Sequence, residues 1–136
     1  MFDFDLPTYK KCTFLNVTAQ VREAVKKSGV QSGAAVVFCP HTTAGVTINE
    51  NADPDVTSDI LAALDELVPK IDFLHIEGNS PAHIKTLLTG SSVNVPVEGG
   101  NLALGRWQGI YFCEYDGPRD RKFSVQVLGE PAAHKR

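Results

Sequence analysis

The last third of the chain carries strand signals with no helical pattern between them. Alternating or β-branched stretches occupy residues 92–98, 101–104, 107–115 and 122–128, separated by turn residues such as Gly99 and Gly100. Strands joined by such short turns pair antiparallel, because a parallel pair needs a crossover of a dozen or more residues. The chain therefore lacks the regular strand–helix alternation of a doubly wound sheet.

The first part of the chain mixes helix and strand patterns. Residues 16–28 predict a helix, and Gly29 supplies its C-terminal stop. The continuous apolar run at 34–39 predicts a buried strand, followed by a second β-prone stretch at 45–49. The apolar stripe of the helix is Val17, Val21, Ala24 and Val25.

Two further helices follow. Asp53, Pro54 and Asp55 form an N-cap, a first-position proline and an acidic first turn, and Pro69 ends this helix. A third helix is predicted to begin at Asn79 or Ser80 and to end at Gly90. The sequence thus predicts an α+β fold, an antiparallel sheet or β-sandwich-like core with two to three helices. The inward side chains are expected to be Val56, Ile60, Ala63, Leu64 and Leu67, then Ile84, Leu87 and Leu88.

Size and composition favour one globular domain over residues 1–136. The chain is 43% hydrophobic and 21% charged, as in ordinary folded proteins. A net charge of -3 with scattered basic residues argues against nucleic-acid binding. The start lacks a signal-peptide pattern, and no apolar run is long enough to span a membrane. Residues 131–136 are expected to form a frayed tail, so His134 receives no role.

The three cysteines, Cys12, Cys39 and Cys113, are odd in number and widely spaced, without C-x-x-C pairs. This usage predicts a reducing, cytoplasmic location. Cys39 and Cys113 lie in apolar runs, where a free cysteine behaves as a small buried hydrophobe. A nucleophilic role for Cys39, two residues from His41, is the alternative.

Three histidines fall in two polar segments that are rich in glycine and proline. His41 belongs to residues 38–50, and His75 and His83 belong to residues 75–85. Imidazole is a common metal ligand and the side chain whose unperturbed pKa lies nearest neutrality. The two segments therefore predict a site for metal binding or acid/base chemistry.

The helix start gives His83 a particular environment. In the first helical turn the positive end of the dipole disfavours an imidazolium, and free backbone amides there would bind an anion. His75 and Glu77 precede His83 on a segment expected to be extended, with both side chains on one face. An isolated H-x-E is more typical of a surface or strand-packing histidine with a solvated carboxylate than of a site. It also lacks helical H-E-x-x-H spacing, so a metal would need ligands from separate segments.

Other polar residues have two interpretations each. Thr42 and Thr43, before Gly45, could wrap an anion or form an ordinary turn. Trp107 could stack on a planar ring or belong to the core. Three arginines could bind phosphate bidentately or lie on the surface, namely Arg106, Arg119 and Arg121. Arg119 is the strongest candidate because the Asp-Gly-Pro turn fixes it.

Taken together, these segments resemble the YjbQ family, often labelled secondary thiamine-phosphate synthases. The matching stretches are residues 40–54, 75–85, 90–92, 104–114 and 116–119, in the family's order over most of the chain. The resemblance implies a YjbQ-like α+β domain, a homotrimer, and a pocket near the subunit contacts. Pro81 departs from the aspartate expected in many relatives, so a role for a carboxylate at that position is lost.

The resemblance also implies a weak thiamine-phosphate synthase activity. This reaction joins hydroxymethylpyrimidine diphosphate to a thiazole phosphate and releases diphosphate, whose charge must be neutralised as it leaves. A non-catalytic trimeric domain that binds a metal or anion is the alternative. The expected roles are catalytic for His41, His83 and Glu77, phosphate-binding for Thr42, Thr43, Asn79, Ser91, Ser92 and Arg119, and metal-binding (Mg or Zn) for His41, His75 and His83.

Overall fold

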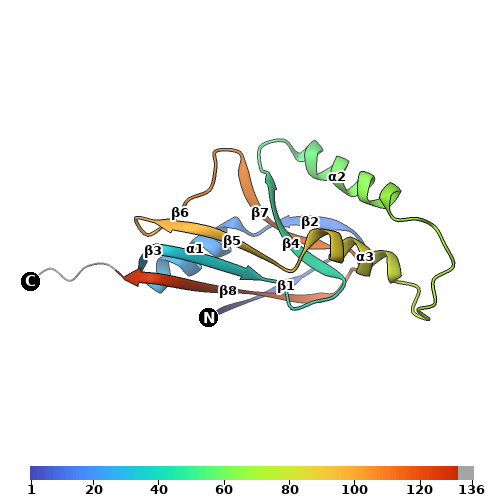
Figure 1. Ribbon diagram of the computed structural model, residues 1–136, viewed down its shortest axis with the longest axis horizontal. Helices are drawn as coiled ribbons and strands as arrows, with labels where there is room; N and C mark the ends of the chain where they lie inside the picture. Colours follow the sequence, from blue (N-terminus) through green and yellow to red (C-terminus); the bar gives the residue numbers. More distant parts are fainter. Residues whose placement is uncertain (132–136) are drawn as a thin grey trace, which may run out of the picture.

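A computed structural model describes residues 1–131 of the chain. Over this range two antiparallel sheets are built from the strands, one of five in the order β1-β8-β3-β5-β6 and one of three in the order β2-β7-β4. Figure 1 shows their arrangement with the helices. The elements are β1 (Phe2–Pro7), β2 (Thr13–Asn16), α1 (Thr18–Ser28), β3 (Val30–Phe38), β4 (Ala44–Glu50), α2 (Pro54–Leu67), α3 (Ser80–Thr89), β5 (Ser92–Glu98), β6 (Asn101–Leu102), β7 (Gln108–Glu114) and β8 (Asp120–Pro131).

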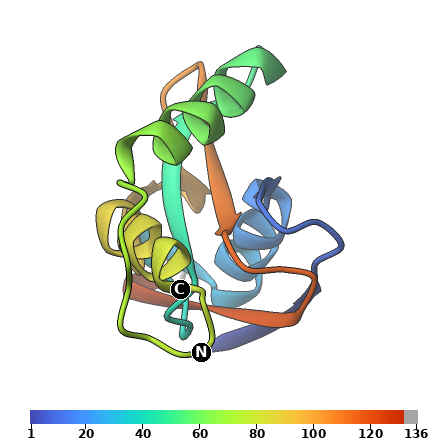
Figure 2. The ribbon, with the colours of Figure 1, turned by 90° about the vertical axis from the view of Figure 1, so that its right-hand side faces the viewer.

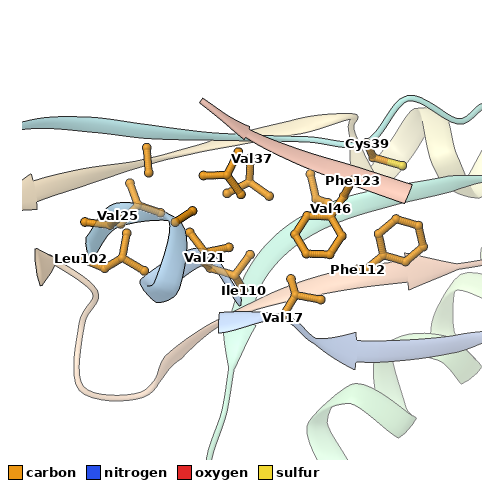
Figure 3. Packing of buried hydrophobic residues seen from close by; sticks show 14 of the residues in the cluster. Val17, Val21, Val25, Val37, Cys39, Val46, Leu102, Ile110, Phe112 and Phe123 are labelled. Atoms are coloured by element: carbon orange, nitrogen blue, oxygen red, sulfur yellow. The ribbon is translucent and has the colours of Figure 1, made fainter. Parts of the chain in front are cut away.

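The larger of two apolar clusters in residues 1–131 lies between the sheets, as Figure 3 shows. Val37 and Phe123 come from the large sheet, Val46 and Phe112 from the small sheet, and all four are buried. Because both sheets turn a face toward this core, the α+β, sandwich-like prediction is confirmed.

Helix α1 closes one end of the core. The four residues of its predicted stripe, Val17, Val21, Ala24 and Val25, are all buried. Gly29 ends the helix with φ 73°, a conformation that favours glycine. The helix begins at Thr18 rather than Asn16, because Asn16 still belongs to β2 and its side-chain oxygen accepts the Thr18 N–H at 3.0 Å.

Several strand predictions need correction. β3 begins earlier than expected, at Val30, and it is not buried throughout: Ala35 and Val37 face the core, whereas Phe38 is 45% exposed. Strands β1 and β2 were not predicted.

Trp107 precedes β7 and is exposed, with the Arg106 guanidinium 4.8 Å from its ring centroid, so it is not a core residue. Pro131 ends β8 rather than beginning a tail, and His134 lies outside the described residues.

The apolar faces predicted for α2 and α3 are also wrong in part. No residue of α2 is buried, and Figure 1 and Figure 2 show this helix standing out from the sheets. On α3, Ile84 is only half-buried and Leu87 is 80% exposed, while Ala82 and Lys85 are the buried residues. The predicted N-cap holds, since the Asp53 carboxylate accepts the Asp55 N–H at 2.9 Å.

Strands β3 and β8 approach each other closely at Gly33, which pairs with Gly129. A Cβ on Gly33 would overlap the carbonyl oxygen of Leu128, a backbone atom that cannot rotate away. We expect Gly33→Ala to lower the free energy of unfolding by about 1–3 kcal/mol, the usual range for overpacking. Urea unfolding measures this, with Gly105→Ala as control, because a Cβ there meets only the flexible Gln108 side chain. Equal stability of the two variants would contradict the prediction.

Candidate functional site

A cavity of about 390 Å³ lies at the end of the molecule where β3 stops and α3 begins. Figure 2 faces this end and shows the segment between α2 and α3 running beside α3. Both histidine segments contribute to the cavity, as the family resemblance implied. Its lining consists of Pro40, His41, Thr42, Thr43, His75, Glu77, Asn79, His83, Arg119 and Arg121.

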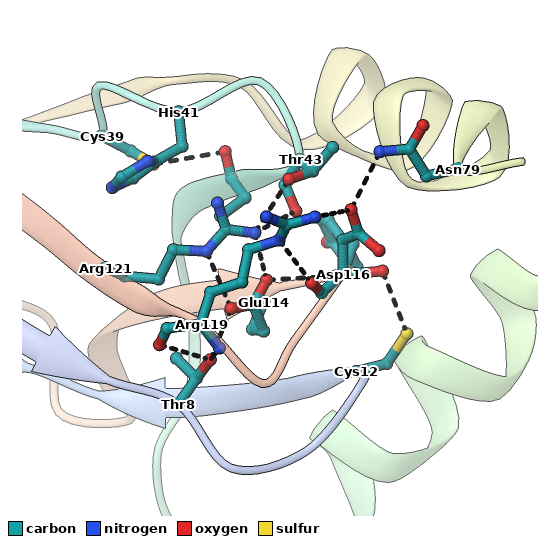
Figure 4. Close-up of polar contacts among 12 residues, drawn as sticks. Thr8, Cys12, Cys39, His41, Thr43, Asn79, Glu114, Asp116, Arg119 and Arg121 are labelled. Carbon is teal, nitrogen blue, oxygen red and sulfur yellow. Dashed lines mark hydrogen bonds and ion pairs between the residues drawn. The ribbon is translucent and has the colours of Figure 1, made fainter. Parts of the chain in front are cut away.

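Arg121 lines this cavity and is held from behind by a buried ion pair with Glu114. Glu114 is fully buried and Arg121 is 5% exposed. Arg121 donates from Nε to Glu114 Oε1 at 2.8 Å and from Nη2 to Glu114 Oε2, and Nη2 also donates to Thr43 Oγ1 at 2.8 Å (Figure 4). Within residues 1–131, Nη1 has no hydrogen-bond partner, so its N–H groups remain available to a molecule in the cavity.

Further contacts keep Glu114 charged. Burial alone would raise the pKa of Glu114, but hydrogen bonds from Arg121, Thr8 and the Asp116 amide outweigh burial and hold the pKa below its ordinary value. The Thr8 hydroxyl donates at 2.6 Å and the Asp116 N–H at 3.0 Å. The guanidinium of Arg121 is therefore fixed by a carboxylate that stays ionised at neutral pH.

Arg119 is held in a similar way. Its Nε donates to the Asp116 carbonyl oxygen at 2.8 Å and its Nη2 to Asp116 Oδ2 at 3.0 Å, again leaving Nη1 without a partner among the described residues. Asp116 Oδ2 also accepts from Asn79 Nδ2 at 2.9 Å, which joins this turn to the start of α3. Burial would raise the pKa of Asp116, but these bonds from Asn79 and Arg119 lower it. Two fixed guanidinium groups thus face one cavity, an arrangement suited to phosphate.

His41 lies beside β8, just past the end of β3. Its Nε2 is 3.0 Å from the Lys122 amide nitrogen and 3.1 Å from the Lys122 carbonyl oxygen. Burial, followed by the nearby positive charge of Arg121, lowers the pKa of His41, so the ring is neutral at pH 7. Either neutral tautomer satisfies Nε2, by accepting from the amide or donating to the carbonyl. Nδ1 is then the ring nitrogen left for a ligand, a proton or a metal.

His75 and His83 meet on the other side of the cavity. Their rings are 5.6 Å apart between centroids and nearly perpendicular, at 87°. His75 and Glu77 do not lie on an extended segment as predicted: the Gly78 N–H donates to the His75 carbonyl at 3.3 Å and forms a turn. This turn nevertheless brings both side chains to the cavity. Glu77 Oε2 accepts from Asn79 Nδ2 at 3.3 Å.

The backbone anion site predicted at the start of α3 is wrong in large part. The Asn79 carbonyl accepts the N–H groups of Ala82 and His83, at 3.0 and 3.3 Å, and Pro81 has no N–H. Ser91 and Ser92 do not line the cavity either, because they join α3 to β5 and pair with the end of β3. Anion binding therefore depends on the arginine side chains rather than on helix amides.

The predicted metal ligands are not preassembled. Within residues 1–131, no three His, Cys, Asp or Glu side chains are grouped as a metal site would require. His41 is set apart by its contact with Lys122. Among the residues that the structure describes, Glu77 is the one carboxylate that lines the cavity, whereas magnesium prefers several oxygen ligands. The donor set as it stands does not fit a magnesium ion.

The importance of the buried residues Glu114 and Arg121 was not predicted from the sequence. Glu114 was not singled out, and Arg121 was ranked below Arg119. On β8, Arg121 shares the inward face with Phe123 and Val125, so a charged residue at an inward-facing strand position was the available signal.

Cys39 and Cys113 are buried, and burial raises the pKa of their thiols to about 11 and about 12. Both are uncharged thiols at neutral pH, as the core interpretation requires.

Comparison with known proteins agrees with the family resemblance. The model of the YjbQ family, described as UPF0047 protein YjbQ-like, matches residues 3–130. The chain belongs to the YjbQ family. UPF0047 protein YugU of Bacillus subtilis is 49% identical, over 91% of this chain and 96% of the relative. UPF0047 protein MJ1081 of Methanocaldococcus jannaschii is 47% identical, over 96% and 95%.

Solved YjbQ structures share this fold. An uncharacterised conserved YjbQ/UPF0047 protein of Clostridium acetobutylicum superposes with a TM-score of 0.92 at 57% identity, covering 94% of this chain and 100% of its own. A YbjQ-like protein of unknown function from Sulfolobus solfataricus gives 0.90 at 34% identity, over 95% and 96%. No helix in residues 1–131 of this YjbQ chain is long and apolar enough to cross a membrane.

Proposed function

We propose that this YjbQ protein is an enzyme that acts on a phosphorylated small molecule. The observation that carries the proposal is the pair of fixed guanidinium groups, Arg119 and Arg121, which line the same cavity as three histidines. Fixed positive groups stabilise a leaving phosphate because they need no rearrangement as charge develops. The Thr42 and Thr43 side chains add hydroxyls to the lining.

The candidate reaction is formation of thiamine phosphate. In this transfer the thiazole nitrogen gives its electron pair to the pyrimidine methylene carbon, the carbon–oxygen bond breaks, and diphosphate leaves with that bond's electrons. The two arginines would hold the diphosphate, and His41 and His83 would donate or accept protons on it. In the alternative role, in place of proton transfer by His83, His75 and His83 together would bind zinc, one of the divalent ions that imidazole suits.

We also propose that the protein assembles as a homotrimer in the reducing cytoplasm. Large apolar side chains on α2, α3 and the segment between them are exposed, more than an isolated chain normally leaves uncovered: Leu67, Ile71, Leu74, Ile76, Leu87 and Leu88. The three cysteines are free thiols, which suits a reducing compartment. Light scattering measures the mass, and a monomer would overturn the assembly proposal.

Turnover tests the proposed function directly. Purified protein without a histidine tag is incubated with hydroxymethylpyrimidine diphosphate, thiazole phosphate and magnesium or zinc, and thiamine phosphate is quantified by oxidation to its fluorescent thiochrome. Steady formation above the rate without protein supports the enzyme. Binding of both compounds without turnover would instead favour the non-catalytic domain.

Arg119→Ala is expected to weaken binding of inorganic diphosphate by about 10-fold or more, because a charge-assisted hydrogen bond contributes about 1.5–3 kcal/mol. The fold should persist, since Arg119 is half-exposed and Asp116 keeps its hydrogen bond from Asn79. Calorimetric titration measures the affinity, and Arg22→Ala on α1 is the matched control. Equal affinity of the Arg119 variant and wild type would remove Arg119 from the site.

A further inference from the structure

A second cavity, of about 370 Å³, adjoins the first, and Glu77 and Asn79 line both. Its walls combine charged groups with the less polar surfaces of Cys12, Pro81 and Ala82. A cavity of this size accommodates a small ring with one polar substituent. The remaining lining residues are Lys11, Asp65, Gly78, Lys85, Tyr115 and Asp116.

Lys85 gives this second cavity a buried positive charge. Its side chain is only 9% exposed, although the inward side chains predicted for α3 were Ile84, Leu87 and Leu88. The ammonium has three N–H groups, and among the described residues Asp65 Oδ1, at 3.3 Å, is its one hydrogen-bond acceptor. A buried ammonium held by a single acceptor retains capacity for another anionic partner.

The partner of Lys85 is easily exchanged. Asp65 belongs to α2 and its side chain is 71% exposed, so it can turn into water at small cost. The oxyanion of a ligand can then take its position beside the ammonium, which stays in place. Lys11, which also lines the cavity, adds a second positive charge.

We propose that this second cavity binds the phosphate ester that accepts the transferred group, with its phosphate on Lys85 and its ring toward Glu77 and Asn79. This inference rests on the proposed function and assigns the acceptor's subsite. The diphosphate substrate occupies the first cavity, and the two reacting atoms meet where the cavities share a wall. When the ring nitrogen forms its bond to carbon and diphosphate leaves, the nitrogen becomes positive, and the Glu77 carboxylate stabilises that charge.

Binding of thiazole phosphate and of inorganic diphosphate, measured separately by calorimetric titration, tests the assignment without requiring turnover. Lys85→Gln should weaken thiazole phosphate at least 10-fold and leave diphosphate affinity within 2-fold, whereas Arg119→Ala should do the reverse. Asp65→Asn should tighten thiazole phosphate 2- to 5-fold, because the competing carboxylate is removed. Lys27→Gln, on exposed α1 surface, is the charge-matched control.

The outcomes separate this inference from the proposed function. If Lys85→Gln and Asp65→Asn both bind thiazole phosphate like wild type, or if Arg119→Ala rather than Lys85→Gln loses it, the subsite is wrong while turnover can still occur. If the predicted pattern is found but no thiamine phosphate forms, the second anion site stands and the enzymatic proposal falls. Failure of wild type to bind thiazole phosphate at millimolar concentration overturns the inference outright.

Discussion

Glu114→Gln is expected to lower the free energy of unfolding by about 3 kcal/mol, because it leaves the buried Arg121 guanidinium without its counter-ion. For a chain of this length the midpoint temperature should fall by about 10 °C. Thermal unfolding followed by circular dichroism measures this. Glu23→Gln, which breaks the exposed ion pair with Lys27, is the control and should cost less than about 1 kcal/mol.

The effect of Glu114→Gln should depend on pH. Because the folded pKa of Glu114 lies below its ordinary value, its charge adds stability above about pH 4.5, and that stability is lost as the pH falls through the folded pKa. The stability difference between wild type and variant should therefore shrink below pH 4.5. A difference that stays constant between pH 7 and pH 3 would show that Glu114 is not held charged by its partners.

His83→Ala should lower kcat for thiamine phosphate formation about 100-fold or more, the range for loss of a general acid or base. His83 is half-buried in the first turn of α3, with His75 beside its ring. Little stability should be lost, because His83 contributes no side-chain hydrogen bond within the described residues and the helix hydrogen bond uses its backbone N–H. Stopped assays with thiochrome detection measure the rate.

Two further variants sharpen this prediction. His83→Gln retains a polar side chain of similar size but cannot transfer a proton at neutral pH, so it should be as slow as His83→Ala. Lys27→Ala, on α1 and distant in the fold, should keep the wild-type rate. A His83→Ala enzyme with unchanged kcat and KM would remove His83 from the chemistry, whatever its place in the cavity.

Much of the architecture could be predicted because local signals agreed with the tertiary structure. The strand predicted at 92–98 has the bounds of β5, and the cap at Asp53 and the stop at Gly29 lie where expected. The apolar positions of α2 and α3 could not be predicted, because periodicity identifies a stripe but not what covers it. Leu87 is exposed and Lys85 buried since the sheet-facing side of α3 is not its most apolar side.

The site was predicted less completely than the fold. Segments 38–50 and 75–85 do share one cavity, with His41, His75 and His83 in its lining. The supporting pair Glu114 and Arg121 depends on strand register across the two sheets, which a single sequence does not show. Two of the amides expected to be free at the start of α3, those of Ala82 and His83, donate to the Asn79 carbonyl, a detail of helix geometry rather than of residue type.

The end of β3 at Phe38 makes one backbone amide of β8 sensitive to the protonation of His41. Because β3 ends at Phe38, it does not pair with Lys122, and in the tautomer whose Nε2 carries no proton the His41 ring is the acceptor of the Lys122 amide. An imidazolium cannot accept, and the pKa of His41 lies below its ordinary value of 6.5, so the amide loses this bond only in mildly acidic solution. Hydrogen exchange of the Lys122 amide therefore reports whether the His41 ring in the cavity is charged. A bound anion that stabilises the charged ring would move this change in exchange rate to higher pH.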